Sequence, residues 1–152
     1  MQPGSKKGMS KKLFLASFAF FAIFAFFASY YLLAQQSRKA EVIELGKEFE
    51  LKIDQEAIVE GESLAVAFES VLEDSRCPKG VDCIWSGNAK ISIKSIKPKQ
   101  TPAKIELNTD DGPKSSTYMN YEIKLVALKP NRKPDVPLQR DEYRAVLIIS
   151  KK

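Results

Sequence analysis

The sequence predicts an all-β fold, an antiparallel immunoglobulin-like β-sandwich preceded by one N-terminal transmembrane helix. Three observations lead to this prediction. Residues 13–34 form an uninterrupted apolar run. After this run, short segments alternate apolar and polar side chains, which is the pattern of strands with one buried face. Turn-forming residues separate these segments, and no helical segment lies between them to connect the strands of a parallel sheet.

The apolar run is predicted to be a membrane-spanning helix. Within residues 13–34 the only frankly polar side chains are Ser17 and Ser29. A helix of this length rises about 33 Å, which is enough to cross a hydrocarbon core of about 30 Å. Tyr30 and Tyr31 lie near its outer end, where aromatic rings favour the membrane interface.

Basic residues flank the run unevenly and predict its orientation. The lysines that precede it are Lys6, Lys7, Lys11 and Lys12. Because positive flanks stay on the cytoplasmic side, residues 1–12 are predicted to be a basic cytoplasmic arm and residues 13–34 a signal anchor in contact with membrane lipid. Residues 35–47 follow as a juxtamembrane linker, and residues 48–152 form an extracytoplasmic β-domain. The predicted location is a membrane crossed once, with the N-terminus on the cytoplasmic side.

A cleaved signal peptide is the alternative interpretation of the same run, and cleavage would release a secreted domain. Cleavage requires small residues one and three positions before the cut. A cut after Ala34 places Leu32 at the third position, and a cut after Ala28 places Phe26 there. The run also exceeds the roughly 7–15 apolar residues of a signal peptide. We therefore expect a retained anchor.

Six segments of the β-domain alternate with a period of two. They are Phe49–Ile53, Leu64–Phe68, Lys90–Lys94, Ala103–Leu107, Tyr121–Leu125 and Tyr143–Ile149. Ala57–Val59 fits a short seventh strand, and Glu41–Leu45 fits either the beginning of a strand or a packed lead-in. Turn signals occur at Glu60–Glu62 and Asp110–Pro113. Three prolines predict a loop before the last segment, namely Pro130, Pro134 and Pro137.

Composition excludes several classes of activity. The chain has no histidine, so it lacks the residue needed for Ser-His-Asp or Cys-His catalysis and the commonest metal ligand. Its two cysteines are too few for a four-cysteine zinc site. Four of the 24 basic residues precede the apolar run, which leaves 20 against 19 acidic residues, without the clustered positive charge of a nucleic-acid binder. We expect neither an enzyme nor a protein that uses a cofactor, a metal or nucleic acid.

The most specific feature is the segment Asp74–Ala89, which reads DSRCPKGVDCIWSGNA. Cys77 and Cys83 are predicted to form a disulfide, because an exported chain meets an oxidising environment. Closing this loop stabilises the fold by about 2.4 kcal/mol on the chain-entropy account. The alternatives are a redox pair, which usually has C-x-x-C spacing, and a metal site, for which soft ligands are too few. Calcium is a further alternative on turn aspartates, although their spacing fits no EF-hand loop.

Three residues of this segment are predicted as partner contacts: Arg76, Lys79 and Trp85. A constrained loop with basic side chains is analogous to the loops of protease inhibitors, so protease inhibition through the disulfide loop 74–88 is the alternative function. Trp85 is the single tryptophan, and such a residue in a small sandwich more often plugs the core or a loop than contacts a ligand. We therefore expect the ring to hold Trp85 against one end of the sandwich. The leading interpretation is a membrane-anchored domain with a binding or structural role and an envelope protein as partner.

The same segment resembles a group of small exported bacterial proteins of uncharacterised function, which share D-S-R-C-P, a second cysteine and W-x-G-x-A. The matching residues are Asp74, Ser75, Arg76, Cys77, Pro78, Cys83, Trp85, Gly87 and Ala89. The later stretches YEIKLVALKP and EYRAVLII are also similar to the group, so the resemblance covers most of the β-domain. It implies bacterial export and the disulfide, so the membrane of the predicted anchor would be the bacterial inner (cytoplasmic) membrane. It implies no particular activity.

Overall fold

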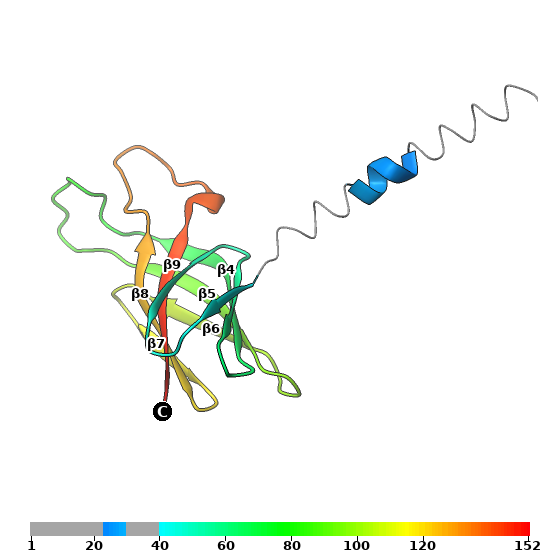
Figure 1. Cartoon of the computed structure of the whole chain (residues 1–152). Coiled ribbons are helices and arrows are strands. Elements are labelled where there is room, and N and C mark those ends of the chain that lie inside the picture. The colour runs from blue at the N-terminus through cyan, green and yellow to red at the C-terminus, as the bar shows by residue number, and fades with distance from the viewer. Residues whose placement is uncertain (1–22, 30–39) are drawn as a thin grey trace, which may run out of the picture. The chain divides into compact units, whose positions relative to one another are not determined.

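The computed structural model describes residues 23–29 and 40–152. Residues 23–29 form a helix within the predicted span 13–34 (Figure 1), and the rest of that span, like the predicted arm 1–12, lies outside the described residues. Within the described part, no helix is both long and apolar enough to cross a membrane. The chain divides into two compact units, and the second, Lys39–Lys152, contains the β-domain.

Residues 40–152 form nine strands arranged in two sheets (Figure 1). The first sheet has the order β1-β3-β4-β5-β6 and the second has the order β2-β9-β8-β7. The strands of the first sheet are β1 (Glu41–Ile43), β3 (Glu56–Val59), β4 (Ala65–Asp74), β5 (Ala89–Ile96) and β6 (Ala103–Asn108). Those of the second are β2 (Glu48–Lys52), β7 (Ser115–Tyr118), β8 (Tyr121–Lys129) and β9 (Arg144–Lys151).

The two-residue period of the sequence forms the buried face of each sheet. In β2, Phe49 and Leu51 are buried while the residues on either side are exposed. The two buried faces enclose one core, whose large, fully buried side chains include Tyr121, Phe68, Leu51, Leu64, Ile91 and Ile93. All six alternating segments lie on strands, as does the short seventh segment at β3. The prediction of a mostly β domain with two sandwich-like sheets is therefore confirmed.

The structure contains one strand that was not predicted, β7, and it resolves the alternatives left open for Glu41–Leu45 in favour of a strand. Strand β1 lies near the end of the predicted linker 35–47 and pairs with β3 in parallel, so the expectation of purely antiparallel pairing is wrong at this edge. The physical reason is Ile43, which is buried in the core and draws this short segment onto the sheet. Strand β7 pairs with β8, and its polar sequence offers little apolar alternation apart from buried Tyr118.

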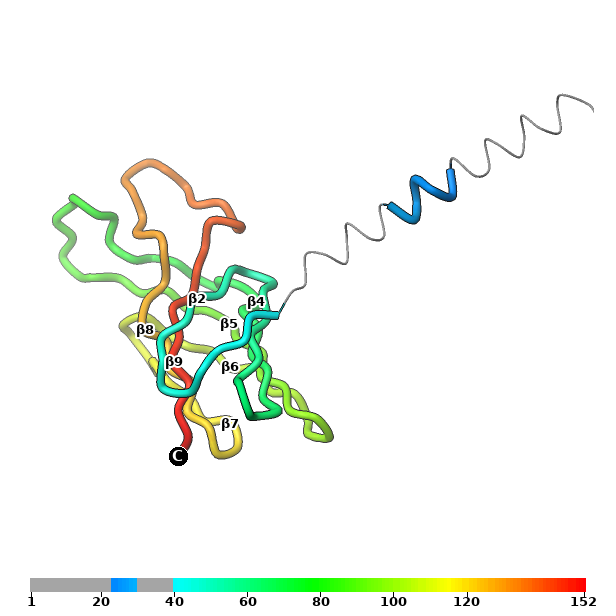
Figure 2. The backbone as a smooth tube through the Cα atoms, in the orientation of Figure 1, coloured from blue at the N-terminus to red at the C-terminus, as the bar shows by residue number. Residues whose placement is uncertain are grey.

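Consecutive strands pair along most of both sheets. Strands β3, β4, β5 and β6 form one meander, and β7, β8 and β9 form another, with β2 beside β9 (Figure 2). An immunoglobulin sandwich connects its two sheets in a Greek-key order instead. The meander places every second connection at the same end of the molecule, and this arrangement determines which loops meet.

Three long connections meet at one end of the sheets, where the short β2–β3 connection also lies. Residues 75–88 join β4 to β5, and residues 130–143 join β8 to β9 (Figure 1). Lys79 N–H donates to the Arg132 carbonyl oxygen at 2.9 Å, so these two connections are hydrogen-bonded to each other. The connection between β6 and β7 lies at the same end as these two. Residues of the three connections form the candidate site.

Two of the strands that lead to this end, β4 and β8, contain bulges. The register of β4 shifts after Phe68 and again after Val71, and the register of β8 shifts after Leu125. A bulge interrupts the alternation of side chains between the two faces, which explains why the alternating sequence segments stop at Phe68 and Leu125. The extra length of β4 places Asp74 at the base of the 75–88 connection.

Candidate functional site

Cys77 and Cys83 form a disulfide with a Cα–Cα separation of 6.0 Å, as predicted. Below the ring, the two arms of the connection are hydrogen-bonded to each other. Cys77 N–H donates to the Ser86 carbonyl at 2.7 Å, and Ser75 N–H donates to the Asn88 carbonyl at 2.7 Å. The segment is therefore a narrow stalk that continues the ladder of β4 and β5 and carries a closed ring.

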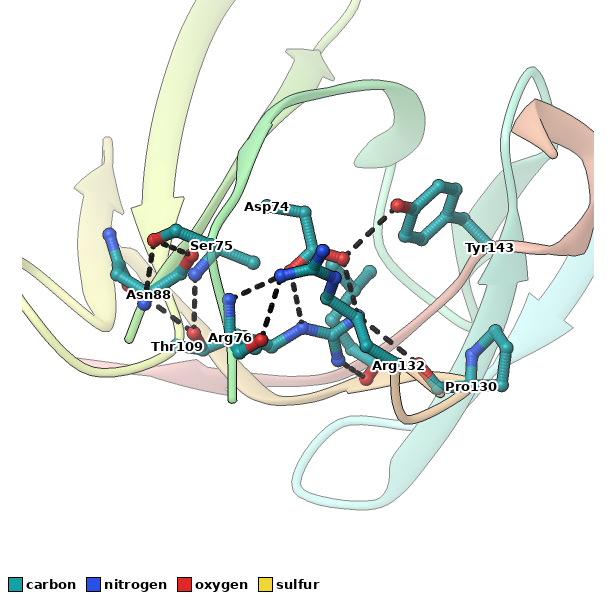
Figure 3. A network of polar contacts seen from close by, with 10 residues as sticks. Asp74, Ser75, Arg76, Asn88, Thr109, Pro130, Arg132 and Tyr143 are labelled. Atoms are coloured by element: carbon teal, nitrogen blue, oxygen red, sulfur yellow. Dashed lines mark hydrogen bonds and ion pairs between the residues drawn. The ribbon is translucent and has the colours of Figure 1, made fainter. Parts of the chain in front are cut away.

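The base of the stalk contains a buried ion pair between Asp74 and Arg76 (Figure 3). Arg76 Nε donates to Asp74 Oδ1 at 2.8 Å and Arg76 Nη2 donates to Asp74 Oδ2 at 2.7 Å. The Arg76 side chain is only 13% exposed and the Asp74 side chain only 7%. A planar guanidinium matches a carboxylate in this two-pronged geometry. Tyr143 Oη donates a further bond to Asp74 Oδ2 at 3.1 Å.

Arg76 also joins the two long connections (Figure 3). Its guanidinium donates to the carbonyl oxygens of Leu128 and Pro130, the latter at 3.1 Å. Arg132 in turn donates to the Arg76 carbonyl at 2.9 Å. The structure thus places Arg76, a predicted partner contact, in the interior of the base, where its donors are engaged by its own chain.

Electrostatics at the base favour the charged form of Asp74. Burial alone would raise the pKa of this carboxyl, but the hydrogen bonds and positive charge of Arg76, with the Tyr143 hydroxyl, hold the pKa below its usual value. Burial and the charge of Asp74 raise the pKa of Tyr143, so the phenol stays protonated and donates to the carboxylate. The base is therefore a charged and hydrogen-bonded cross-link.

Gly87 and Asn88 hold the stalk against the neighbouring segments. Gly87 has a φ of +69°, and a Cβ atom there would lie 2.0 Å from the Ser75 carbonyl oxygen, so only glycine fits without a backbone shift. The Asn88 side-chain amide donates to Asn108 Oδ1 at 2.8 Å, and Asn88 Oδ1 accepts the Asp110 N–H at 3.0 Å. These bonds join the stalk to the β6–β7 connection.

This end of the β-domain presents large apolar side chains to solvent. Ile84 is 96% exposed and Trp85 is 76% exposed. Val81 on the ring and Val136 in the 130–143 connection are also exposed, and Lys79 is an exposed basic residue of the ring. The expectation that Trp85 plugs one end of the sandwich is wrong, because the bonds that fix the stalk leave the indole outside the core.

An open cavity of about 450 Å³ lies beside Trp85. Its lining consists of Ser75, Trp85, Ser86, Gly87, Asn88, Asp110 and Asp111. The Ser86 hydroxyl donates to Asp110 Oδ2, and Lys114 Nζ lies 3.4 Å from Asp110 Oδ1. These two contacts lower the pKa of Asp110 below its usual value. We call this space the Trp85 cavity.

The aspartates considered for calcium do not form one site. They are Asp74, Asp82, Asp110 and Asp111. Asp74 is engaged by Arg76, whereas Asp110 and Asp111 line the Trp85 cavity. Among the residues that the structure describes, no group of three or more acidic, histidine or cysteine side chains is placed to hold a metal ion.

Sequence reasoning did not single out several residues that build this end of the molecule. Tyr143 was predicted only as a strand residue, and Arg132 as part of a proline-rich loop, yet both bond to the base of the stalk. Ile84 was not named, although two adjacent large apolar residues in a polar loop are a recognisable signal of a contact surface. Comparisons of the chain with family models, curated proteins and solved structures find no match. The site offers a preformed apolar tip beside an acidic cavity, an arrangement suited to binding.

Proposed function

We propose that the β-domain is a non-enzymatic binding module of the bacterial cell envelope, tethered to the inner membrane by residues 13–34, which recognises a protein partner through the tip of its disulfide loop. The observation that carries this proposal is the exposure of Ile84 and Trp85 on a rigid stalk. Large apolar side chains gathered on a surface are typical of interaction sites. We call Val81, Ile84 and Trp85, which are the exposed large apolar residues of the disulfide loop, the binding tip.

The energetics of association favour such a tip. Burying one large apolar side chain stabilises a complex by about 1.5–3 kcal/mol, and tryptophan is enriched among the residues that dominate interface energies. A loop already held in its bound shape loses little conformational entropy on association. The disulfide and the Asp74–Arg76 pair supply this rigidity in the connection that carries Trp85 and at its base.

Three features support a location outside the cytosol. The disulfide between Cys77 and Cys83 is of a kind that persists in oxidising compartments. The apolar run 13–34, with lysines before it, is typical of a signal anchor. The resemblance to small exported bacterial proteins points the same way. Cleavage of the run is the alternative, and it would release the same binding module in soluble form.

The proposal retains one part of the immunoglobulin-like interpretation. In immunoglobulin variable domains, a rigid two-sheet body presents recognition loops at one end. Here the 75–88 and 130–143 connections stand at one end of two sheets. Because the strand order is a meander, we infer a shared way of presenting loops and not a shared topology.

Site-specific crosslinking tests the proposed partner contact. A photoreactive amino acid at position 84 of the full-length chain, activated in intact bacterial envelopes, should give a discrete adduct with one protein. Trp85→Ala should weaken that adduct by about tenfold or more, the effect of removing a dominant interface side chain. The same amino acid at Met119, an exposed residue beyond the other end of β8, is the control and should give no such adduct.

Three outcomes would overturn the proposal. Adducts at position 84 with lipid alone would assign the tip to the membrane surface. Equal adducts at positions 84 and 119, or no protein adduct at either, would remove the tip as a recognition site. Loss of the adduct in Trp85→Ala is interpretable only with retained folding, so the variant is compared with the parent by circular dichroism.

Protease inhibition through loop 74–88 is the alternative function, and one observation favours it. Lys79 is exposed on the ring, and its backbone N–H is fixed to the Arg132 carbonyl, as the rigid loop of an inhibitor requires. In that case Lys79→Ala would abolish stoichiometric inhibition of a trypsin-like protease, and Trp85→Ala would leave inhibition unchanged. The binding module predicts no inhibition by either form.

A further inference from the structure

We infer that the Trp85 cavity receives a cationic side chain, an arginine or lysine, presented by the protein partner. This inference rests on the proposed function, because the cavity adjoins the binding tip and shares Trp85 with it. The exposed indole forms one part of the lining, and Asp110 and Asp111 form another. A partner whose apolar residues cover Ile84 would thereby bring a neighbouring basic side chain to the cavity.

The charge of the lining selects a cation. The face of an indole attracts positive charge, and the two aspartates add negative charge beside it. The Ser86 hydroxyl and Lys114 lower the pKa of Asp110, so this carboxylate is ionised at neutral pH. No lysine or arginine belongs to the lining. Within the described part of the chain, Lys114 contacts Asp110, and Asp111 is left without such an ion pair.

Hydrogen-bonding capacity distinguishes a cation from a neutral sugar. The Ser75 hydroxyl donates to the Asn88 carbonyl at 3.0 Å, and the Ser86 hydroxyl donates to Asp110. The Asn88 side-chain amide is engaged by Asn108 and by the Asp110 backbone. The lining therefore offers mainly carboxylate acceptors. A guanidinium or ammonium carries only donors, whereas each sugar hydroxyl both donates and accepts, so the cation is the better match.

The cavity is large enough to admit one arginine or lysine side chain. A volume of about 450 Å³ falls within the range of small-ligand sites. Gly87 contributes no side chain to the lining, and its backbone is fixed against Ser75. Asp110 is fixed by the Asn88 side chain and the Ser86 hydroxyl. The Asp110 carboxylate is therefore already in place before a partner binds.

Trp85 itself reports occupancy of the cavity, because it is the chain's single tryptophan. Titration of the purified full-length protein with N-acetyl-arginine amide should change the tryptophan emission saturably at millimolar concentrations. N-acetyl-citrulline amide has the same shape without the charge. Its affinity should be lower by at least about tenfold, because it loses the charge-assisted hydrogen bonds. Asp111→Asn should lower the affinity for the arginine probe by about tenfold. Asp135→Asn, the same change in the neighbouring connection, should leave this affinity unchanged.

Several results would overturn the inference. They are equal affinity for the arginine and citrulline probes, an unchanged affinity in Asp111→Asn, no saturable change with the arginine probe, or a preference for methyl glucoside. Circular dichroism and the unfolding midpoint establish that both variants are folded. The outcome is separable from that of the proposed function. Crosslinking at position 84 with no cation preference refutes only the cavity, and cation binding without crosslinking refutes the protein partner.

Discussion

Asp74 accepts hydrogen bonds from Arg76 and Tyr143, which belong to two different connections at the same end of the domain. A buried carboxylate is tolerated only when its charge and its hydrogen-bonding capacity are both met. Here Arg76 meets the charge and Tyr143 meets a remaining lone pair. Substituting either Asp74 or Arg76 therefore destabilises the fold, because the remaining side chain is left charged and buried.

The variant Asp74→Asn is expected to destabilise the β-domain by about 3 kcal/mol, because it leaves the buried guanidinium of Arg76 uncompensated. Urea unfolding of the full-length chain, followed by far-ultraviolet circular dichroism, measures this cost. Glu50→Gln is the matched control. It breaks the exposed pair with Lys129 and should cost less than about 1 kcal/mol. Equal costs for the two variants would show that the Asp74–Arg76 pair adds nothing through its burial.

The lowered pKa of Asp74 also predicts how this difference changes with pH. An unfolded aspartate has a pKa of about 3.9, and the folded value is lower. The stabilisation by the charged form is therefore complete above that value and is lost as the pH falls through the folded pKa. The stability difference between the parent and Asp74→Asn should shrink below about pH 4. A constant difference down to acid unfolding would contradict this assignment.

Arg76 and Trp85 show what a local sequence cannot reveal at the residue scale. The pairing of Cys77 with Cys83 follows from compartment and composition, and it is present. For Arg76 and Trp85, which flank the ring, the expectation was an exposed arginine and a packed tryptophan. The structure shows the reverse. The buried arginine requires the carbonyls of Leu128 and Pro130, which lie far along the chain. No local pattern records such a contact.

At the scale of elements, the stalk and the ring have separate supports. The base of the stalk is held by Asp74 and Arg76 and by the bonds between Ser75 and Asn88. The ring is closed by the disulfide and is also held by the hydrogen bond from the Lys79 N–H to the Arg132 carbonyl. Opening the ring should therefore loosen the tip while the sheets stay intact.

Replacing Cys77 and Cys83 together by serine is expected to destabilise the domain by about 1–3 kcal/mol without changing its fold, because the open ring adds conformational freedom to the unfolded chain. Because Trp85 is already exposed, its emission maximum should stay nearly constant in the variant. Urea unfolding and fluorescence spectra measure both effects. A large red shift would show that the indole is buried in the oxidised protein, and a changed circular dichroism spectrum would show that the ring determines the fold.

The period of two predicted which segments are strands, but it did not predict where they end or which strands are short. Bulges in β4 and β8 change the face of the following residues, so the alternation disappears although the strand continues. Strand β1 has three residues and is held by distant pairing with β3 rather than by its own pattern. Strand β7 is polar, so its pairing with β8 leaves little trace in the sequence.

At the scale of the whole molecule, the class of fold was predictable and the strand order was not. Alternation determines which face of a strand is buried, and it carries no information about which strand lies beside it. The same limit applies to the site. The disulfide and the exposed ring were expected, whereas the Trp85 cavity depends on the β6–β7 connection meeting the stalk. Only the assembled sheets bring these two segments together.

The predicted anchor is tested on the intact protein. Alkaline phosphatase fused after Lys152 should be active, because the β-domain is expected outside the cytosol, and the protein should resist extraction by carbonate. Deletion of residues 13–34 is the control and should abolish phosphatase activity. A mature N-terminus near Gln35 would show that the run is cleaved, and an inactive fusion would place the domain inside the cell.

The chain ends on the side of the domain that lies opposite the disulfide loop. Strand β9 begins next to the 130–143 connection and runs away from it (Figure 1), and Lys152 N–H donates to the Asn120 carbonyl at 2.9 Å. A tag, fused enzyme or solid support attached at Lys152 therefore stands at the far end from Trp85. Immobilised in this way, a population of molecules displays its tips to the solution in a common orientation, which makes the carboxyl terminus a suitable handle for measuring the binding surface.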